Sequence, residues 1–439
     1  MTQTQLNSHT VNTTKQDLRY YFLWLWALVI TSSLVLSPRL GDSDLLTFIR
    51  IDDILFPITF IITLSLLSYI HPVNKLIVAF ICLYLFNSIV LFITHNYGFN
   101  SVSIIKKFLP VCKNIQYLTY FCFFFGFTSK AKSFKQIKYL FLTIFICFIP
   151  NFLYCLSQVI TLKFTGFYGL EIINETSPTL TGAVFHVATI ICGLLAQLEK
   201  KDNIKLFWIF LTIIHGIFTV LTGSRGASFA LFTYFVSIGM HQLLHLIIKR
   251  KISKYNLNVF LIISLIVSAS LFIIFLIPSI RFEMESILNL LPTRGIDLEN
   301  LGNEERVDNW SNTLFFYIHI VNEFPLLGLF GLGSGGIYEI FGRLLNAADS
   351  QYVYTIITGG LIGSLLYINA FIRLYQLGRY KTSNSMLPLF PTFLGLFWSF
   401  MAFAISQEVF HISKPGGLFW TMCGLLIGSA CSKPNQKIR

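Results

Sequence analysis

Twelve apolar stretches of about 17 to 24 residues run along this chain, and its net positive charge lies at the termini and in every second gap between them. An α-helix needs about 20 residues to cross a bilayer core of about 30 Å. Hydrophobic residues occupy 54% of the 439 positions and charged residues only 12%, a balance unlike that of soluble domains. We therefore predict an all-α, polytopic transmembrane helix bundle that forms one integral membrane domain over residues 1–439. The expected spans are roughly 20–37, 54–70, 76–94, 108–127, 138–159, 179–197, 206–222, 228–247, 259–278, 352–372, 387–406 and 416–432.

The distribution of charge predicts the orientation of the bundle. When the N-terminus, every second loop and the C-terminus are taken as one side, that side carries 20 of the 32 Lys and Arg residues but only three of the 20 acidic residues. Lys and Arg are enriched in cytoplasmic loops, so both termini are expected in the cytoplasm. The net charge of +12 then reflects membrane topology, and no nucleic-acid partner is expected.

One external connection, 279–351, is far longer than the others. It is rich in acidic residues and spans about 70 residues, well beyond ordinary loop lengths. Within it, Asp308 or Asn309 is expected to cap a helix with an apolar stripe, which Pro325 would end. The stripe suits a helix on the membrane surface and consists of Trp310, Leu314, Ile318 and Val321.

A glycine run follows that predicted helix. Gly331, Gly333 and Gly336 fit the spacing GxGxxG, but a dinucleotide site also needs a strand before the glycines and a helix after them. Neither is expected here. We favour a glycine-rich turn that lets the backbone approach a ligand or a neighbouring helix.

Arg225 is the first candidate for chemistry. It lies in Thr222-Gly-Ser-Arg-Gly-Ala-Ser228, a tight external turn between the seventh and eighth spans. The arginine could simply reach toward lipid headgroup phosphates. We favour a fixed guanidinium fork that binds a phosphate or diphosphate, because glycines on both sides indicate a shaped turn.

Four further charged residues have competing interpretations. Arg306 lies among acids and is either a surface ion pair or a second contact for an anionic substrate. Asp349 is either the N-cap of the tenth span or a general base. Glu175 lies at the start of the sixth span, where helix N–H groups could instead take an anion. Lys113 lies inside the fourth span, where an ionisable residue is by default a functional hypothesis.

Other chemistry is disfavoured. The sequence has no His, Cys and carboxylate cluster with metal-ligand spacing and no P-loop, so a metal-dependent glycosyltransferase and an ATP-driven pump are not expected, and no cofactor or metal is predicted. His186 and His215 lie within apolar spans, where an interhelical hydrogen bond is favoured over catalysis.

Several of these motifs together resemble the bacterial O-antigen polymerase and O-antigen ligase superfamily. The similar features, all between about 160 and 370, are Glu175-Thr-Ser-Pro178, the turn 222–227, Arg306-Val-Asp-Asn-Trp310, Pro325-Leu-Leu-Gly328 with the glycines to 336, and Asp349-Ser-Gln-Tyr352 leading into 358–363. Their order and their shared external side are typical of that superfamily.

The resemblance implies metal-independent, inverting glycosyl transfer at the outer face of the bacterial inner membrane. The donor would be an oligosaccharide on undecaprenyl diphosphate, and Arg225 and Arg306 would bind the diphosphate and stabilise its departing charge. Asp349 would complete the catalytic residues. The expected substrate-binding residues are Ser224, Glu175, Lys113, Gly333, Gly335 and Tyr352.

Alternatives remain open at this point. Ligases of the superfamily typically show His-Asn or His-Ser where this chain has Asp349-Ser350, which favours a polymerase and leaves open whether Asp349 is the base. A lipid-linked oligosaccharide flippase would predict charged residues deep in the helices, and only Lys113 looks embedded. The expected partners are the lipid-linked oligosaccharide and membrane lipids; a separate chain-length regulator is left open.

Overall fold

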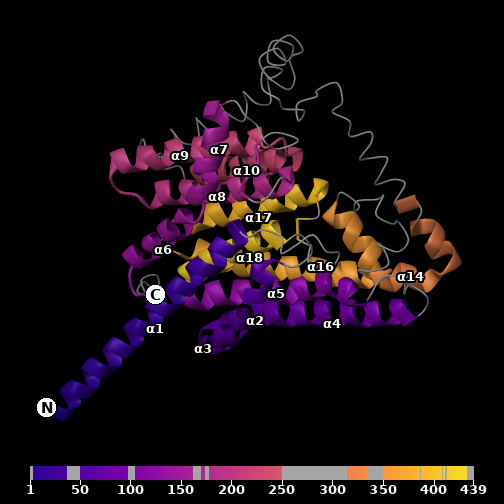
Figure 1. Ribbon diagram of the computed structural model, residues 1–439, viewed down its shortest axis with the longest axis horizontal. Coiled ribbons are helices and arrows are strands. Elements are labelled where there is room, and N and C mark those ends of the chain that lie inside the picture. Colours follow the sequence, from indigo (N-terminus) through magenta and orange to yellow (C-terminus); the bar gives the residue numbers. More distant parts are fainter. Residues whose placement is uncertain are drawn as a thin grey trace, which may run out of the picture.

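The computed structural model describes residues 3–36, 50–96, 104–161, 170–173, 177–249, 314–315, 317–333, 350–385, 387–407, 409–410 and 413–432. Throughout these ranges the secondary-structure elements are helices, packed into one elongated bundle from which the first helix projects (Figure 1). The predicted all-α class is confirmed.

Five helical stretches in the described ranges are long and apolar enough to cross a membrane. They are α1 (Gln3–Leu36, apolar over Leu18–Leu36), α8 (Pro178–Leu198), α9 (Asp202–Leu221), α16 (Gln351–Ser383) and the stretch Leu67–Thr94. The pair α6 (Phe134–Ile146) and α7 (Ile149–Thr161) would make a sixth span, bent by 45°. The chain is thus a multi-pass membrane protein by the length and composition of its helices, and the count of twelve spans stays a prediction.

Two predicted spans are divided into separate helices. The expected span 54–70 is divided, because α2 (Ile51–Leu64) ends before a turn at Ser65 and Leu66. The chain then continues through α3 (Leu67–Ile70) and the short η2 (His71–Val73) into α4 (Asn74–Asn96). In the expected span 138–159, Pro150 has no N–H to donate to the preceding turn, which accounts for the bend between α6 and α7.

The remaining helices are α5 (Ile104–Ser129), α10 (Arg225–Lys249), α14 (Pro325–Phe330), α17 (Leu389–Ser406) and α18 (Ser413–Ala430). α18 runs beside α5 (Figure 1). A Cβ atom on Gly424 would lie 2.5 Å from the carbonyl oxygen of Phe121, and one on Gly428 would lie 2.5 Å from that of Phe125. Glycines at the contact therefore let the two backbones touch, which is how helices gain close packing in a membrane protein.

Helix α8 is the most deeply buried of the candidate spans. Nearly all of its side chains are buried, and the apolar window that qualifies it as a span is buried throughout. The core beside it is aromatic: the Trp420 ring lies 4.8 Å from Phe80 and 5.6 Å from Phe371, measured between centroids. α8 is therefore enclosed by protein, and it contacts α9, α18, α10, α6 and α17.

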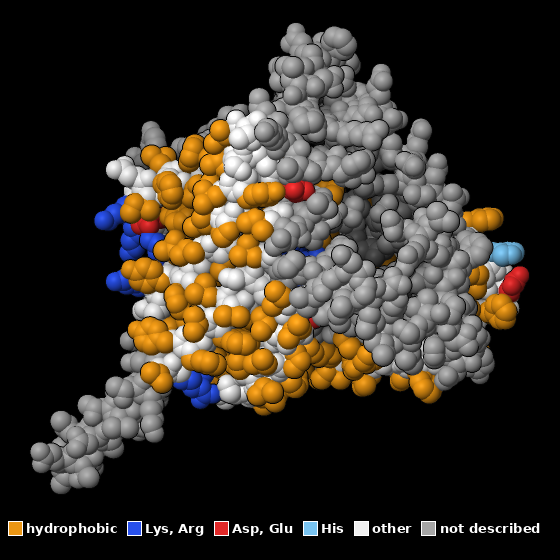
Figure 2. All heavy atoms as spheres, in the orientation of Figure 1, with side chains coloured by type: hydrophobic (Ala, Val, Ile, Leu, Met, Phe, Trp, Pro, Cys, Tyr) orange, Lys and Arg blue, Asp and Glu red, His pale blue; other side chains and the backbone are white. Residues whose placement is uncertain are grey.

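Charge is distributed unevenly along the bundle. Most of the described Lys and Arg side chains visible in Figure 2 gather at its left end, and apolar side chains cover the flank. At that end Lys138 of α6 pairs with Glu199, which follows α8, and so joins two of the basic turns. Most of the described basic side chains visible in this view thus lie at one end of the bundle; which face of a membrane this end adjoins stays a prediction.

Part of the predicted surface helix is described. Residues 317–323 are helical, and the helix ends before Pro325, which begins α14, as expected. The apolar side chains of Phe315 and Ile318 are exposed, which suits a helix that contacts lipid. The expected caps, Asp308 and Asn309, and also Trp310, lie outside the described residues.

Candidate functional site

A polar face on α5 is the most concentrated chemistry in the described ranges. Lys113, Gln116, Tyr117 and Tyr120 recur three or four residues apart, so they share one side of the helix. Lys113 pairs with Asp53 in the first turn of α2, where the helix N-terminus also stabilises a carboxylate. The side chains are 10% and 16% exposed. Lys113 is therefore held in an internal ion pair and does not reach the membrane surface.

Asp52 is the neighbour of that pair and is almost fully buried. Gln116 donates from Nε2 to the Oδ2 atom of Asp52 at 3.1 Å and to the hydroxyl oxygen of Tyr120 at 2.8 Å. The Tyr120 hydroxyl donates to the backbone carbonyl of Asp52 at 2.8 Å. The Oδ1 atom of Asp52 and the hydroxyl of Tyr117 have no hydrogen-bond partner in the structure described. The result is a buried polar network in which two groups, the Oδ1 atom of Asp52 and the hydroxyl of Tyr117, can each make a further hydrogen bond.

Sequence reasoning missed Asp52 and Asp53. The predicted span began at 54, so the two acids were treated as part of the preceding loop. A signal was available: two adjacent acids open an apolar span while a single lysine lies inside a neighbouring one. Because a charge within a membrane span needs a partner, the embedded Lys113 indicates that a carboxylate lies nearby.

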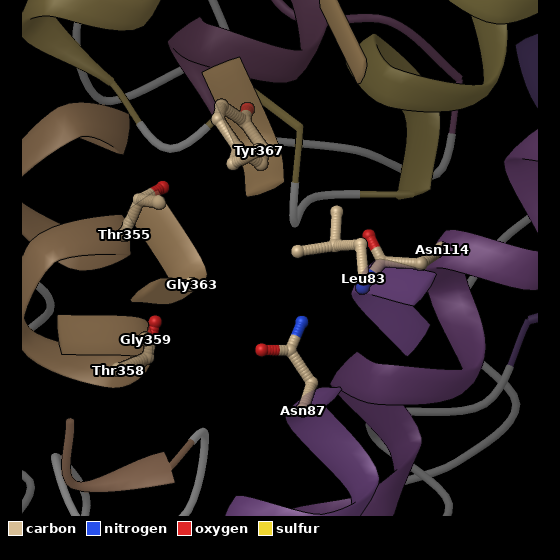
Figure 3. Close-up of a pocket in the computed structure, with 8 residues that line it drawn as sticks. All are labelled: Leu83, Asn87, Asn114, Thr355, Thr358, Gly359, Gly363 and Tyr367. Atoms are coloured by element: carbon tan, nitrogen blue, oxygen red, sulfur yellow. The ribbon is translucent and has the colours of Figure 1, made fainter. Parts of the chain in front are cut away.

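A pocket lies beside this network, between α4, α5 and α16. Asn114, next to Lys113, lines it with two side chains of α4 and five residues of α16. Figure 3 shows the α4 and α5 residues facing those of α16 across the space. The centre of a water molecule can occupy a volume of about 20 Å³ within this pocket, so the pocket can hold at least one water. The residues lining the pocket are Leu83, Asn87, Asn114, Thr355, Thr358, Gly359, Gly363 and Tyr367.

The turn before Arg225 has the shape that the sequence predicted. Gly223 adopts a positive φ of 71°, a conformation that glycine takes without steric cost. The Oγ atom of Ser224 accepts a hydrogen bond from the N–H of Ala227 at 3.2 Å and so caps α10, which begins at Arg225. Ser224 is buried and was predicted to bind substrate; here its hydroxyl serves the cap.

The glycine run approaches a neighbouring helix, which is one of the two uses expected of it. The N–H of Leu332 donates to the carbonyl of Ile357 at 2.8 Å. A Cβ atom on Gly331 would lie 2.5 Å from the backbone nitrogen of Gly360, where α16 is kinked with a φ of 58°. Gly333 lies against Thr94 of α4, at 3.0 Å from its ideal Cβ position to Oγ1. A helix precedes the glycines, so a dinucleotide-binding strand is absent from this position.

Tyr352 and the two histidines have separate partners. The hydroxyl of Tyr352 donates to the carbonyl of Met401 at 2.9 Å and joins the start of α16 to α17. The Nε2 atom of His186 lies 2.8 Å from the Ser399 hydroxyl, so the interhelical bond expected of His186 is confirmed. His215 bonds instead to the carbonyl of Leu211 in its own helix, at 2.8 Å.

The remaining predicted site residues lie outside the part of the chain that the structure describes. Arg306, Asp349, Glu175 and Gly335 lie outside the described residues, as does the side chain of Arg225. Whether the two arginines converge on one site therefore stays a prediction. Among the residues that are described, no group of three or more His, Cys, Asp or Glu side chains could hold a metal ion.

Comparison with known proteins adds no assignment. No protein-family model matches the chain, and no curated protein matches it either. The resemblance to O-antigen polymerases and ligases therefore depends on the motifs alone.

Proposed function

We propose that this protein is a surface-polysaccharide polymerase of the O-antigen type, which joins oligosaccharide units carried on undecaprenyl diphosphate. A hydroxyl of the acceptor unit attacks the anomeric carbon of the donor glycan. The bond from that carbon to the diphosphate oxygen breaks, and undecaprenyl diphosphate leaves. The acceptor hydroxyl loses its proton to a base, for which Asp349 is the candidate.

The observation that supports this proposal is the fixed turn before Arg225. Gly182 of α8 lies so close to it that an added Cβ would be 2.5 Å from the Cβ of Ala227. The N–H of Leu170 bonds to the carbonyl of Leu221, the last residue of α9, at 3.0 Å. A residue on so rigid a backbone can stabilise a leaving diphosphate without reorganisation, which is the main requirement for electrostatic catalysis.

The surroundings of the turn add two supports. The turn follows α9, which begins with Lys201 as its N-cap and carries Lys205 in its first turn. A helix of 20 residues is about 30 Å long. The turn is thus remote from the basic end of the bundle. In addition, α10 begins at Arg225, and free N–H groups at a helix start favour an anion.

A transporter is the second candidate, and a specific observation favours it. Buried carboxylates and a buried lysine inside a membrane protein commonly mark a transport path, and Asp52, Asp53 and Lys113 form such a group. In this alternative the protein would move the lipid-linked unit across the membrane, and the chemistry would belong to another protein.

The test is reconstitution of the purified protein in liposomes with the lipid-linked repeat unit on both leaflets. The polymerase proposal predicts products of several units, still on undecaprenyl diphosphate, and a loss of at least about 100-fold in rate for Arg225→Ala and Arg306→Ala. Arg379→Ala is the matched control, because Arg379 is an exposed arginine near the C-terminal end of α16, outside the motifs that carry the proposal. No elongation by the wild-type protein would refute the proposal, and normal elongation by both variants would remove the role of the arginines.

Analysis of glycolipids from cells that lack the gene separates the alternatives. Loss of a polymerase leaves single units on the carrier, accessible from outside the membrane. Loss of a ligase leaves long chains on the carrier. Loss of a flippase leaves single units that enzymes added outside sealed spheroplasts do not reach.

A further inference from the structure

The pocket between α4, α5 and α16 gathers three hydrogen-bonding side chains that have no partner in the structure described. Asn87 and Asn114 line it with amide groups that make no hydrogen bond to other residues. Tyr367 lines it with a hydroxyl that is buried and unpaired. Asn114 is 7% exposed. Each group comes from a different helix, so local chain geometry alone does not explain why they meet.

Of the three groups, the Tyr367 hydroxyl is the one that is fully buried without a partner, and this is unfavourable unless something fills the space beside it. Buried polar groups in native proteins are nearly always paired, and the exceptions require an explanation such as a water or a ligand. The two threonines of the pocket do not supply the missing bonds, because Thr355 donates to the carbonyl of Gln351 and Thr358 to that of Tyr354. The three unpaired groups therefore face a space that accommodates a small polar group.

The chemistry of the lining selects the kind of group. An amide presents a donor and an acceptor, and a tyrosine hydroxyl can do either. All the side chains that line the pocket are uncharged, and Lys113, next to Asn114, is turned to Asp53 instead. A phosphate or carboxylate would meet no cation here. A hydroxyl, which both donates and accepts, matches these partners.

We propose that the pocket is a subsite for a neutral saccharide and takes one hydroxyl-bearing edge of a sugar ring, with water in its place when no sugar is bound. The proposal deepens the polymerase proposal and rests on it for the identity of the ligand as a saccharide. The small volume means that the ring as a whole lies outside the pocket and only its edge enters.

Gly359 offers a way to fill the pocket without disturbing the fold. A Cβ atom added there has one neighbour within 4 Å, the backbone nitrogen of Ser364 at 3.5 Å, which is an ordinary contact. Gly359→Ala should therefore fold normally and occupy part of the space. Asn87→Leu is a second variant, which keeps the side-chain size and removes the amide. Gly216→Ala in α9 is the matched control, since its Cβ would lie 3.7 Å from Leu231.

The experiment measures sugar binding directly, by saturation-transfer NMR on the full-length protein in lauryldimethylamine oxide, a detergent without a sugar headgroup. The probes are methyl glycosides of hexoses, 6-deoxyhexoses and N-acetylhexosamines. We expect at least one probe to bind the wild-type protein and Gly216→Ala equally. Gly359→Ala and Asn87→Leu should weaken that binding by at least about tenfold while eluting as the same single species.

Two results would overturn the inference: no binding of any probe to the wild-type protein, which would leave a water site only, or undiminished binding to both pocket variants. These results are independent of turnover. Sugar binding that depends on Gly359 in a protein that does not elongate chains would refute the polymerase and leave the subsite standing. Elongation at the wild-type rate by both pocket variants, with no probe binding, would do the reverse.

Discussion

Lys113 of α5 and Asp53 of α2 form an ion pair in which both side chains are largely buried. The two residues are 60 positions apart in the sequence. Asp52 and Arg50, which are both buried, lie close to Asp53 in the sequence and add one negative and one positive charge to the group. Replacing Lys113 therefore removes one of two cations from a group that contains two carboxylates, and leaves an uncompensated charge in a poorly solvated place.

The first prediction concerns that dependence. Lys113→Met should lower the free energy of unfolding by about 3–5 kcal/mol, because it removes the ion-pair partner of the Asp53 carboxylate. The measurement is unfolding in mixed micelles followed by circular dichroism. The double variant Lys113→Met/Asp53→Leu should recover most of the loss, since it removes both charges. A single variant as stable as the wild type would show that the pair contributes nothing.

The second prediction concerns the turn that carries Arg225. Gly182→Ala places a methyl group 2.5 Å from the Cβ of Ala227 and 3.1 Å from that of Ser224. Helix α8 and the turn must then separate, at a cost of about 1–3 kcal/mol in stability. If Arg225 acts on a diphosphate, elongation should fall more than stability does. Gly216→Ala, which meets only an ordinary contact, is the control for both measurements.

The third prediction concerns the crossing of the glycine run over α16. Gly360→Ala combines a positive φ with a contact of 2.5 Å to the backbone of Gly331, so it should destabilise the protein by at least about 1–3 kcal/mol. Its neighbour is the control: Gly359→Ala should leave the melting temperature nearly unchanged. Equal melting temperatures for the two variants would contradict the close backbone approach.

The fourth prediction concerns pH. The hydrogen bond from Lys138 lowers the pKa of Glu199, and the N–H groups of Lys201 and Lys200 act in the same direction. A carboxyl whose folded-state pKa is lowered stabilises the fold at neutral pH, and this contribution is lost as the pH falls below about 4.3 and through the lowered value. Lys138→Gln should thus cost about 0.2–1 kcal/mol at pH 7. The difference from wild type should shrink toward pH 3; a difference that grows on acidification would contradict this origin.

The sequence predicted the features that depend on local patterns. Helical class follows from apolar runs, and the positions of Gly223, Gly331 and Gly333 follow from their backbone freedom. The gathering of basic residues also follows, because loops at one end of a bundle share an environment. Breaks within the runs were less visible: the turn at Ser65 lies in a continuous apolar segment, and no residue there signals it strongly.

The polar site was harder to predict because it depends on which helices are neighbours. Asn87, Asn114 and Tyr367 are unremarkable in their own segments, and only the packing of α4, α5 and α16 makes them face one another. The same is true of Asp53 and Lys113. Ser224 shows the opposite kind of error. Its hydroxyl lies in a conspicuous motif and is predicted to bind substrate, but it accepts a hydrogen bond from the first turn of α10 instead.

The crossing at Gly331 and Gly360 has a mechanical consequence. Residues 331–333, which precede α16 in the chain, lie against the peptide of α16 directly after Gly359, and Gly359 forms a wall of the pocket. Movement of residues 331–333 would therefore move this wall of the pocket. Conversely, a molecule lodged against the wall resists the displacement. Binding of a molecule in the pocket and the position of residues 331–333 are therefore coupled through the backbone contact between Gly331 and Gly360.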